Sequence, residues 1–261
     1  MRIGISNAVL YPEPSEITIE KLSGAGFDLF EFFYNCDYEA TSEFLGEIKS
    51  KSNGADFVSI HPYTAFAEGV LFFSACERRT VESIEKYRKV FLAAKELGVS
   101  YFIFHGDRFY GASAKKYALS EDSEKTLSRL SGVAKECGIR LCLENVSWCK
   151  SSSVEYVSDV SERVAEIGFT LDLKQARRAG IDYKEYIKVM GDKLCNIHVS
   201  DFDEARDCLL PGKGKFDFYR FREELESIGY KGDILIEVYS QNFSDFSELA
   251  KSKEFLEKIF S

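Results

Sequence analysis

The sequence is poor in proline and has no low-complexity segment. Only 4 prolines occur in 261 residues, and no stretch rich in glycine and serine interrupts the chain. A chain without such segments shows no linker between separately folded parts. We therefore expect residues 1–261 to form one domain, because this length is enough for a single large core.

Long hydrophobic runs and paired cysteine motifs are also missing. No apolar run approaches the roughly 20 residues that span a bilayer, and the N-terminal segment MRIGISNAVLYPEP lacks the apolar core of a secretion signal. The 7 cysteines are odd in number and show no Cys-x-x-Cys spacing, which argues against a disulfide framework or a zinc knuckle. The chain is therefore expected in a reducing cytoplasm, away from membranes.

Positive charge is in the minority. The 34 lysines and arginines face 43 aspartates and glutamates, which gives a net charge of -9. Binding to a nucleic-acid backbone normally needs a basic surface, so this balance disfavours nucleic acid as a partner. A small molecule is the expected ligand, and the oligomeric state stays open, with a homo-oligomer among the possibilities.

What the sequence does contain is one repeated pattern of apolar runs and amphipathic segments. Most runs are continuously apolar, as in parallel strands that are buried on both faces. The predicted strands are 2–6, 28–33, 56–61, 101–105, 139–144, 168–172, 194–199 and 233–238. Helical periodicity of three and four residues marks the segments 77–97, 120–137, 153–166, 215–228 and 244–260.

This alternation predicts the fold class. Eight strand–helix units over about 250 residues match an α/β protein of the (β/α)₈ TIM-barrel type. A doubly wound open sheet is the alternative, but it needs a glycine-rich phosphate turn after the first strand, and GISNAVLYP is not one. In TIM barrels the active site lies at the carboxyl ends of the strands. The longest loop expected at that end is 62–76, which is rich in aromatic residues.

Ionisable side chains end the last four predicted strands. Glu144, Asp172, His198 and Glu237 would be neighbours around the barrel mouth. Three carboxylates in a small volume repel one another unless a cation lies between them. One histidine with hard oxygen ligands favours Mn²⁺, with Mg²⁺, Co²⁺ or Zn²⁺ as alternatives. The competing interpretation is a set of ion pairs inside the barrel.

Other strand-end residues allow more than one role. His61 and His105 end strands three and four, where they would contact substrate, bind a second metal or be buried histidines satisfied by the backbone. Glu31 would either orient a histidine or serve as an interior structural carboxylate. Trp148 is a candidate pocket wall and Arg206 a candidate contact to a substrate oxygen, and for both an ordinary structural or surface role competes.

Seven short motifs, in order along the chain, resemble those of the xylose-isomerase-like TIM-barrel superfamily. This superfamily includes sugar epimerases, hydroxypyruvate isomerase and endonuclease-IV-type enzymes. The motifs are SIHPY (59–63), FHGD (104–107), LENVSW (143–148), LDLKQARRAG (171–180), IHVSD (197–201), LPGKGKFDF (210–218) and LIEVY (235–239). The resemblance implies a single-metal ligand set of four residues, two of which also move protons. The set is Glu144, Asp172, His198 and Glu237, and the proton-moving pair is Glu144 and Glu237.

The sequence departs from this pattern at two places. An Asp-x-x-His motif on the sixth strand ends here in Gln175, and an Asp-x-His motif after the seventh strand is replaced around 206–208. Both changes remove ligands of the trinuclear zinc cluster found in the endonuclease branch. His61 and His105 match positions that bind extra metal in that branch and substrate in others. With those ligands missing, we expect His61, His105 and Gln175 to contact substrate.

The predicted function is a metal-dependent isomerase or epimerase. Its substrate would be a small sugar or hydroxy-carbonyl compound that reacts through an enediolate. One alternative is a metal-dependent hydrolase or phosphodiesterase of the endonuclease-like branch. Another is a barrel that binds sugar without turnover.

Overall fold

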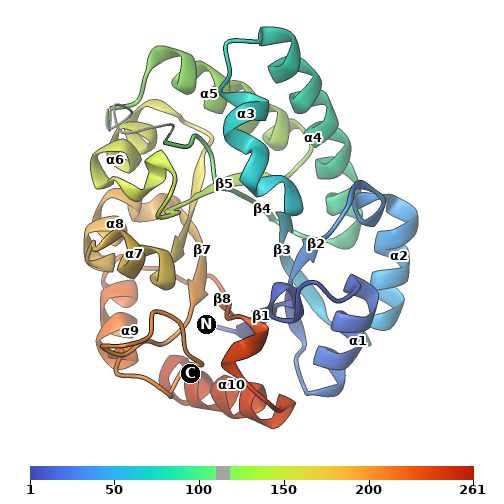
Figure 1. Cartoon of the computed structure of the whole chain (residues 1–261), viewed down its shortest axis with the longest axis vertical. Helices are drawn as coiled ribbons and strands as arrows, with labels where there is room; N and C mark the ends of the chain where they lie inside the picture. The colour runs from blue at the N-terminus through green and yellow to red at the C-terminus, as the bar shows by residue number, and fades with distance from the viewer. Residues whose placement is uncertain (110–117) are drawn as a thin grey trace.

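Eight parallel strands close into a barrel in which each strand pairs with the next one along the chain (Figure 1). The last strand pairs with the first, with Ile236 opposite Ile5, which completes the ring. The computed structural model describes residues 1–109 and 118–261. The strands are β1 (Ile3–Ser6), β2 (Leu29–Tyr34), β3 (Asp56–Pro62), β4 (Tyr101–Phe104), β5 (Arg140–Glu144), β6 (Gly168–Asp172), β7 (Leu194–Val199) and β8 (Ile234–Ile236). The predicted TIM barrel is thereby confirmed.

Helices surround the barrel as an outer ring (Figure 1). In the described residues they are α1 (Ser15–Gly24), α2 (Ser42–Lys51), α3 (Glu68–Phe72), α4 (Glu77–Leu97), α5 (Glu121–Glu136), α6 (Val154–Arg163), α7 (Leu173–Ala179), α8 (Tyr183–Met190), α9 (Phe218–Ser227) and α10 (Phe246–Phe260). The clearest helical pattern, 77–97, agrees with α4 at both ends. Gly98 follows α4 with a φ of 95°, a left-handed conformation that glycine adopts without steric cost.

The layer between the strands and the helices is the main apolar core. Phe102 of β4 packs against Tyr87 and Phe91 of α4, with ring centroids 5.0 and 4.9 Å apart. All three side chains are fully buried. Burial of each such aromatic ring stabilises the fold by about 1.5–3 kcal/mol. This layer holds the strands, and therefore the side chains at their ends, in fixed positions.

Inside the barrel the filling changes from apolar to ionisable along the strand direction. Ile103, Cys142 and Cys195 form an apolar cluster of their own within it. Because side chains alternate between the two faces of a strand, the residue two positions beyond Ile103 is His105, and the residue two beyond Cys142 is Glu144. The interior thus has an apolar floor and a polar upper layer at the carboxyl ends.

Two connections differ from the expectation. The segment 62–76 is not one open loop, because it contains a 3₁₀ turn and the short helix α3. Glu68, the first residue of α3, is fully buried and fixes this segment to the end of β4 by hydrogen bonds. Between β6 and β7 the chain forms α7 and α8, which Gly180 separates with a φ of 71°. Both changes bring helical segments to the barrel mouth.

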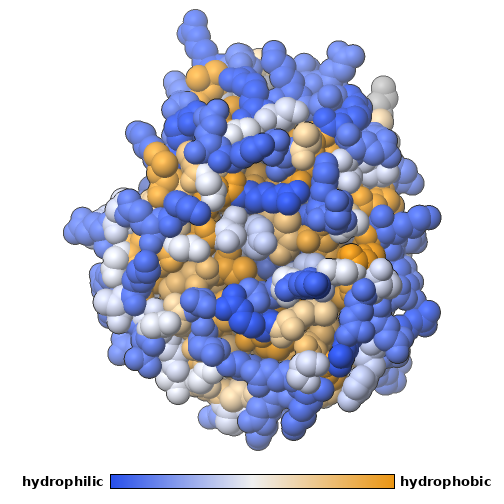
Figure 2. Space-filling model, turned by 180° about the vertical axis from the view of Figure 1, so that it is seen from behind, coloured by the Kyte–Doolittle hydropathy of each residue, from blue (hydrophilic) through white to orange (hydrophobic). Residues whose placement is uncertain are grey.

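The surface seen from behind the view of Figure 1 has a mainly hydrophilic rim with hydrophobic residues between (Figure 2). In residues 1–109 and 118–261, every helix is too short or too polar to cross a bilayer.

Candidate functional site

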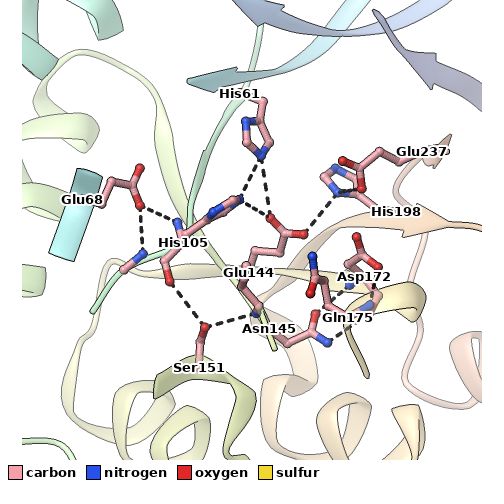
Figure 3. Close-up of polar contacts among 12 residues, drawn as sticks. His61, Glu68, His105, Glu144, Asn145, Ser151, Asp172, Gln175, His198 and Glu237 are labelled. Carbon is pink, nitrogen blue, oxygen red and sulfur yellow. Dashed lines mark hydrogen bonds and ion pairs between the residues drawn. The ribbon is translucent and has the colours of Figure 1, made fainter. Parts of the chain in front are cut away.

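Ionisable residues gather at the carboxyl end of the barrel. Glu144 and Asp172 are the last residues of β5 and β6, His198 lies in β7, and Glu237 directly follows β8. Glu144, Asp172 and His198 are at most 2% exposed, and 16% of the Glu237 side chain is exposed. The strand ends therefore place these four side chains in the interior of the molecule, facing one another (Figure 3).

These four residues form a compact group that we call the carboxylate site. Each offers one nitrogen or oxygen atom, and the four atoms lie within 4.8 Å of one another. His198 Nδ1 lies 3.3 Å from Glu237 Oε2 and 3.7 Å from Glu144 Oε1. The structure thus brings together the four residues that the sequence proposed as a ligand set.

His198 is oriented by a carboxylate behind it. Its Nε2 lies 3.0 Å from Glu31 Oε2, and that same oxygen accepts a hydrogen bond of 2.7 Å from Ser59. Although burial acts in the opposite direction, the charge of His198 keeps the pKa of Glu31 below its ordinary value. The Nδ1 atom of His198 consequently points toward Glu144 and Glu237. Glu31 is therefore the orienting partner, one of its two roles considered from sequence.

Two buried atoms of the carboxylate site have ion-pair contacts but no hydrogen bond among the described residues. They are Asp172 Oδ2, 3.4 Å from Lys174 Nζ, and His198 Nδ1, 3.3 Å from Glu237 Oε2. Buried polar atoms normally have hydrogen-bond partners, so two that converge without one are able to take a further ligand. The donors are carboxylate oxygens and one imidazole nitrogen, which fit a divalent metal ion. The residues present are thus consistent with a divalent metal site.

Like charges packed together shift the pKa values of the carboxylate site. Burial and the charges of Glu237 and Glu144 raise the pKa of Asp172 far above its ordinary value, despite the opposing effect of Lys174. Burial also opposes ionisation of Glu144, but the nearby histidines hold its pKa well below the usual range. The ionised form of Asp172 therefore depends on positive charge beside it. A divalent ion would remove that penalty.

Two histidines form a second group with Glu144, which we call the histidine pair. The Nε2 atoms of His61 and His105 are 3.0 Å apart. Glu144 Oε2 lies 3.0 Å from His105 Nε2 and 3.8 Å from His61 Nε2. Figure 3 shows the Glu144 carboxylate between this pair and His198. Glu144 therefore belongs to both groups, with one oxygen toward each.

The two histidines differ in their electrostatic surroundings. Burial lowers the pKa of His105 below its ordinary value. For His61 burial acts the same way, but Glu144 and Glu31 outweigh it and raise the pKa. Whether the pair contacts substrate, as the sequence analysis expected, or binds a second ion stays a prediction.

Neighbouring amides fix the ligands in place. Asn145 bridges two strands, since its Oδ1 accepts a 2.7 Å hydrogen bond from Asp172 N and its Nδ2 donates to the Asp172 carbonyl oxygen at 3.0 Å. Asp172 Oδ1 accepts from Gln175 N at 2.9 Å and so caps the start of α7. The Gln175 side chain accepts hydrogen bonds from Ser147 N and Oγ at 3.1 and 2.8 Å. Its predicted contact with substrate would have to compete with these bonds.

The remaining predicted site residues lie in different surroundings. The Trp148 ring meets His105 at 5.4 Å and stacks on Phe66 at 5.4 Å, so it lies beside the histidine pair, as a pocket wall would. Arg206 has 61% of its side chain exposed and pairs with Asp203. The structure does not bring Arg206 into either group, and its substrate contact remains a prediction.

Sequence reasoning missed two buried ionisable residues at the site. Glu68 Oε2 accepts hydrogen bonds from His105 N and Gly106 N at 2.7 and 2.9 Å, and burial raises its pKa to about 8. Lys174 Nζ lies 3.0 Å from Glu237 Oε2 and 3.4 Å from Asp172 Oδ2. Glu68 gave no signal within a loop noted for its aromatics. For Lys174 the sequence gives the place, two residues after a strand-end aspartate, but it does not show that the side chain points inward.

Comparison with known families agrees with this geometry. Residues 19–259 match the family model described as xylose isomerase-like TIM barrel. The chain belongs to this family. An uncharacterized protein of Methanocaldococcus jannaschii is 25% identical over 99% of this chain and 89% of its own length. A 3-dehydroshikimate dehydratase of Pseudomonas aeruginosa is 24% identical over 86% of this chain, which spans only 36% of that enzyme.

Solved structures with the same fold include sugar epimerases. A D-tagatose 3-epimerase-like protein superposes with a TM-score of 0.80 at 21% identity, covering 99% of this chain and 97% of its own. D-psicose 3-epimerase from Clostridium cellulolyticum H10, solved with D-tagatose, gives 0.79 at 17% identity over the full length of both chains. The IolI protein with a bound zinc atom gives 0.76 at 18% identity, also over both full lengths. At these identities the likeness establishes the fold.

Proposed function

We propose that this protein is a metal-dependent isomerase or epimerase of a small sugar or related hydroxy-carbonyl compound. The observation that carries the proposal is the carboxylate site, in which three carboxylates and one imidazole offer atoms within 4.8 Å of one another at the mouth of a xylose isomerase-like barrel. The epimerases among the structural neighbours support the choice of substrate class. All seven cysteines are free, which supports a reducing cytoplasm as the location.

Four residues would hold the ion, namely Glu144, Asp172, His198 and Glu237. When bound, a divalent ion would polarise the substrate carbonyl and the adjacent hydroxyl, so that the hydrogen on the carbon between them becomes acidic. Mn²⁺ suits this donor set, and Mg²⁺, Co²⁺ and Zn²⁺ are the alternatives. Glu31 would keep the Nδ1 of His198 aimed at the ion by accepting a hydrogen bond from its Nε2.

Glu144 and Glu237 are the proposed proton carriers. They lie on β5 and on the end of β8, and His198 Nδ1 lies between them at 3.7 and 3.3 Å. His105 and the other nearby histidines hold the pKa of Glu144 low despite burial, so this carboxylate is ionised and able to accept a proton. If the same glutamate returns the proton to the neighbouring atom, the result is isomerisation. If the other returns it to the opposite face, the result is epimerisation.

His61, His105 and Gln175 would contact the substrate hydroxyls, and Trp148 would cover one side of the pocket. The two imidazoles lie on the β3–β4 side of Glu144, opposite the carboxylate site (Figure 3). This arrangement would leave the substrate between a metal-binding half and a hydrogen-bonding half of the mouth.

The direct test is exchange of substrate hydrogen with solvent. The protein is incubated in deuterated water with Mn²⁺ and a panel of ketoses and hydroxypyruvate, and deuterium in recovered substrate is measured by mass spectrometry. The proposal expects exchange with at least one compound and a loss of about 10²–10⁴-fold in Glu144→Gln. Absence of exchange throughout the panel, or exchange that survives Glu144→Gln, would reject it.

A second candidate is a metal-dependent hydrolase, and one observation favours it. The histidine pair and Glu144 also form a group of potential ligands, with the two Nε2 atoms 3.0 Å apart. In a hydrolase of this type each group would hold one ion, with Glu144 contributing to both, and the ions would supply the activation of a water molecule. Elemental analysis separates the two candidates, because the isomerase needs one ion per chain and the hydrolase two. Loss of half the metal in His61→Asn would favour the hydrolase.

A further inference from the structure

A buried lysine lies where two of the candidate metal ligands meet. Lys174 is the second residue of α7, and only 3% of its side chain is exposed. Its Nζ lies 3.0 Å from Glu237 Oε2 and 3.4 Å from Asp172 Oδ2. An ammonium group is buried only where anionic partners compensate for its lost hydration. Here those partners are two carboxylates of the carboxylate site.

The backbone and an aromatic ring keep Lys174 in this place. Asp172 caps α7, so the Cα of Lys174 is tied to the ligand two residues before it. On another side, Lys174 Nζ lies 5.0 Å from the centre of the Tyr239 ring, whose hydroxyl accepts a 2.8 Å hydrogen bond from Arg178. Tyr239 itself is two residues beyond Glu237. The ammonium is thus a built-in part of the site.

The ammonium and a divalent ion would need the same negative charge. Because Lys174 Nζ lies 3.0 Å from Glu237 Oε2, an ion held by Glu237 would share that carboxylate with the ammonium. Two cations beside one buried carboxylate repel strongly when little water separates them. The ammonium also supplies one positive charge among carboxylates that otherwise repel one another. Lys174 therefore stabilises the metal-free chain and opposes the ion.

We infer that Lys174 is a resident counter-ion of the metal site. It balances Asp172 and Glu237 before an ion binds, and it weakens binding of that ion. The site is then stable without metal and releases its ion readily. The inference rests on the proposed function only for the location of the metal site, because it concerns binding and does not require turnover.

The test is calorimetric titration of Mn²⁺ into metal-stripped protein. Lys174→Met and Lys174→Gln are expected to bind Mn²⁺ about tenfold or more tightly than the unaltered chain. Lys184→Met is the matched control, since Lys184 pairs with Glu224 on the outer helices at 3.2 Å, and it should stay within about twofold. Equal or weaker Mn²⁺ binding in both Lys174 variants overturns the inference, and so does the absence of Mn²⁺ binding in every chain. Mn²⁺ binding by the Lys174 variants alone supports the inference.

Thermal unfolding with and without chelator gives a second readout. The Lys174 variants should melt at a lower temperature in chelator and recover with Mn²⁺, whereas the unaltered chain should depend less on metal. A variant that folds only with Mn²⁺ supports the inference. One that fails to fold in both conditions contradicts it, because the ion should replace the missing charge.

The deuterium-exchange assay separates this inference from the proposed function. If the Lys174 variants bind Mn²⁺ more tightly but the unaltered chain exchanges no substrate hydrogen, the counter-ion inference holds and the isomerase proposal fails. If the unaltered chain exchanges substrate hydrogen but the variants bind Mn²⁺ as it does, the isomerase proposal holds and the counter-ion inference fails.

Discussion

The two halves of the barrel mouth balance their polar groups in different ways. On the β5–β8 half, three carboxylates surround one imidazole, and Lys174 places an ammonium 3.0 Å from Glu237. On the β3–β4 half, His61 and His105 face each other at 3.0 Å and are flanked by the rings of Phe33 and Trp148. A carboxylate group needs a cation, whereas two imidazoles are able to share one proton between them. The comparison therefore predicts that the first half binds an ion and the second binds uncharged polar groups.

The largest effect is expected where the two halves meet. Glu144→Gln removes the charge that both groups share, so substrate exchange should fall by about 10³-fold and Mn²⁺ binding should weaken as well. Glu155→Gln is a suitable control, because Glu155 hydrogen-bonds Ser153 at the start of α6. Exchange rates and titration calorimetry measure both quantities. Unchanged Mn²⁺ affinity in Glu144→Gln would contradict its place in the carboxylate site.

Replacing one histidine from each half separates them further. His198→Asn should weaken Mn²⁺ binding by about 100-fold, because its Nδ1 faces two ligand carboxylates. His61→Asn should change Mn²⁺ affinity by less than about threefold, since its nitrogen belongs to the other group. The check is a parallel titration of both variants. Equal losses in the two would show that the halves act as one metal centre.

Replacing Glu31, the carboxylate that orients His198, should weaken Mn²⁺ binding less than replacing a ligand. Glu31→Gln is expected to weaken Mn²⁺ binding by about 10–100-fold, since it removes the charge that aims His198. Ser59→Ala removes only the hydrogen bond to Glu31 and should give a smaller loss. An affinity in Glu31→Gln equal to that of the unaltered chain would mean that His198 is held by other contacts.

Glu68, the first residue of α3, should make the free energy of unfolding depend on pH. Burial raises the pKa of Glu68 to about 8 from an ordinary 4.5. Between these values the folded state keeps a proton that the unfolded state releases, so a rise in pH favours unfolding. The free energy of unfolding should therefore fall by roughly 1–3 kcal/mol between pH 6 and pH 8. Glu68→Gln should flatten this slope in urea denaturation, and a slope that persists in the variant would assign it to another group.

The smallest effect is expected outside both halves. Arg206→Ala removes an exposed guanidinium whose ion pair is with nearby Asp203. The rate of substrate exchange should therefore stay within about twofold of that of the unaltered chain. The same exchange assay measures it. A large loss would restore Arg206 as the substrate contact that the sequence suggested.

The sequence predicted those features that depend on a repeating local pattern. Continuous apolar runs identify eight strands, and in a parallel barrel all their carboxyl ends lie on one face. That is why Glu144 and Asp172 were placed together from sequence alone. Glu31 could be placed at the mouth by the same pattern, but its pairing with His198 depends on the curvature of the closed barrel.

The sequence did not predict the direction in which long side chains point. Lys174 follows Asp172 by two residues, and a lysine at a helix start is usually solvated. Only the position of Tyr239 and Glu237, more than sixty residues later, shows that its ammonium points inward. Glu68 was missed for a similar reason, since its hydrogen-bond partners are backbone amides at the end of another strand.

A crystal soaked in Mn²⁺ and measured by anomalous scattering tests the difference between the two halves most directly. We predict one strong peak per chain, within bonding distance of Glu144, Asp172, His198 and Glu237. A peak between His61 and His105, or no peak at the carboxylate site, would contradict the division of the mouth into a metal-binding half and a hydrogen-bonding half.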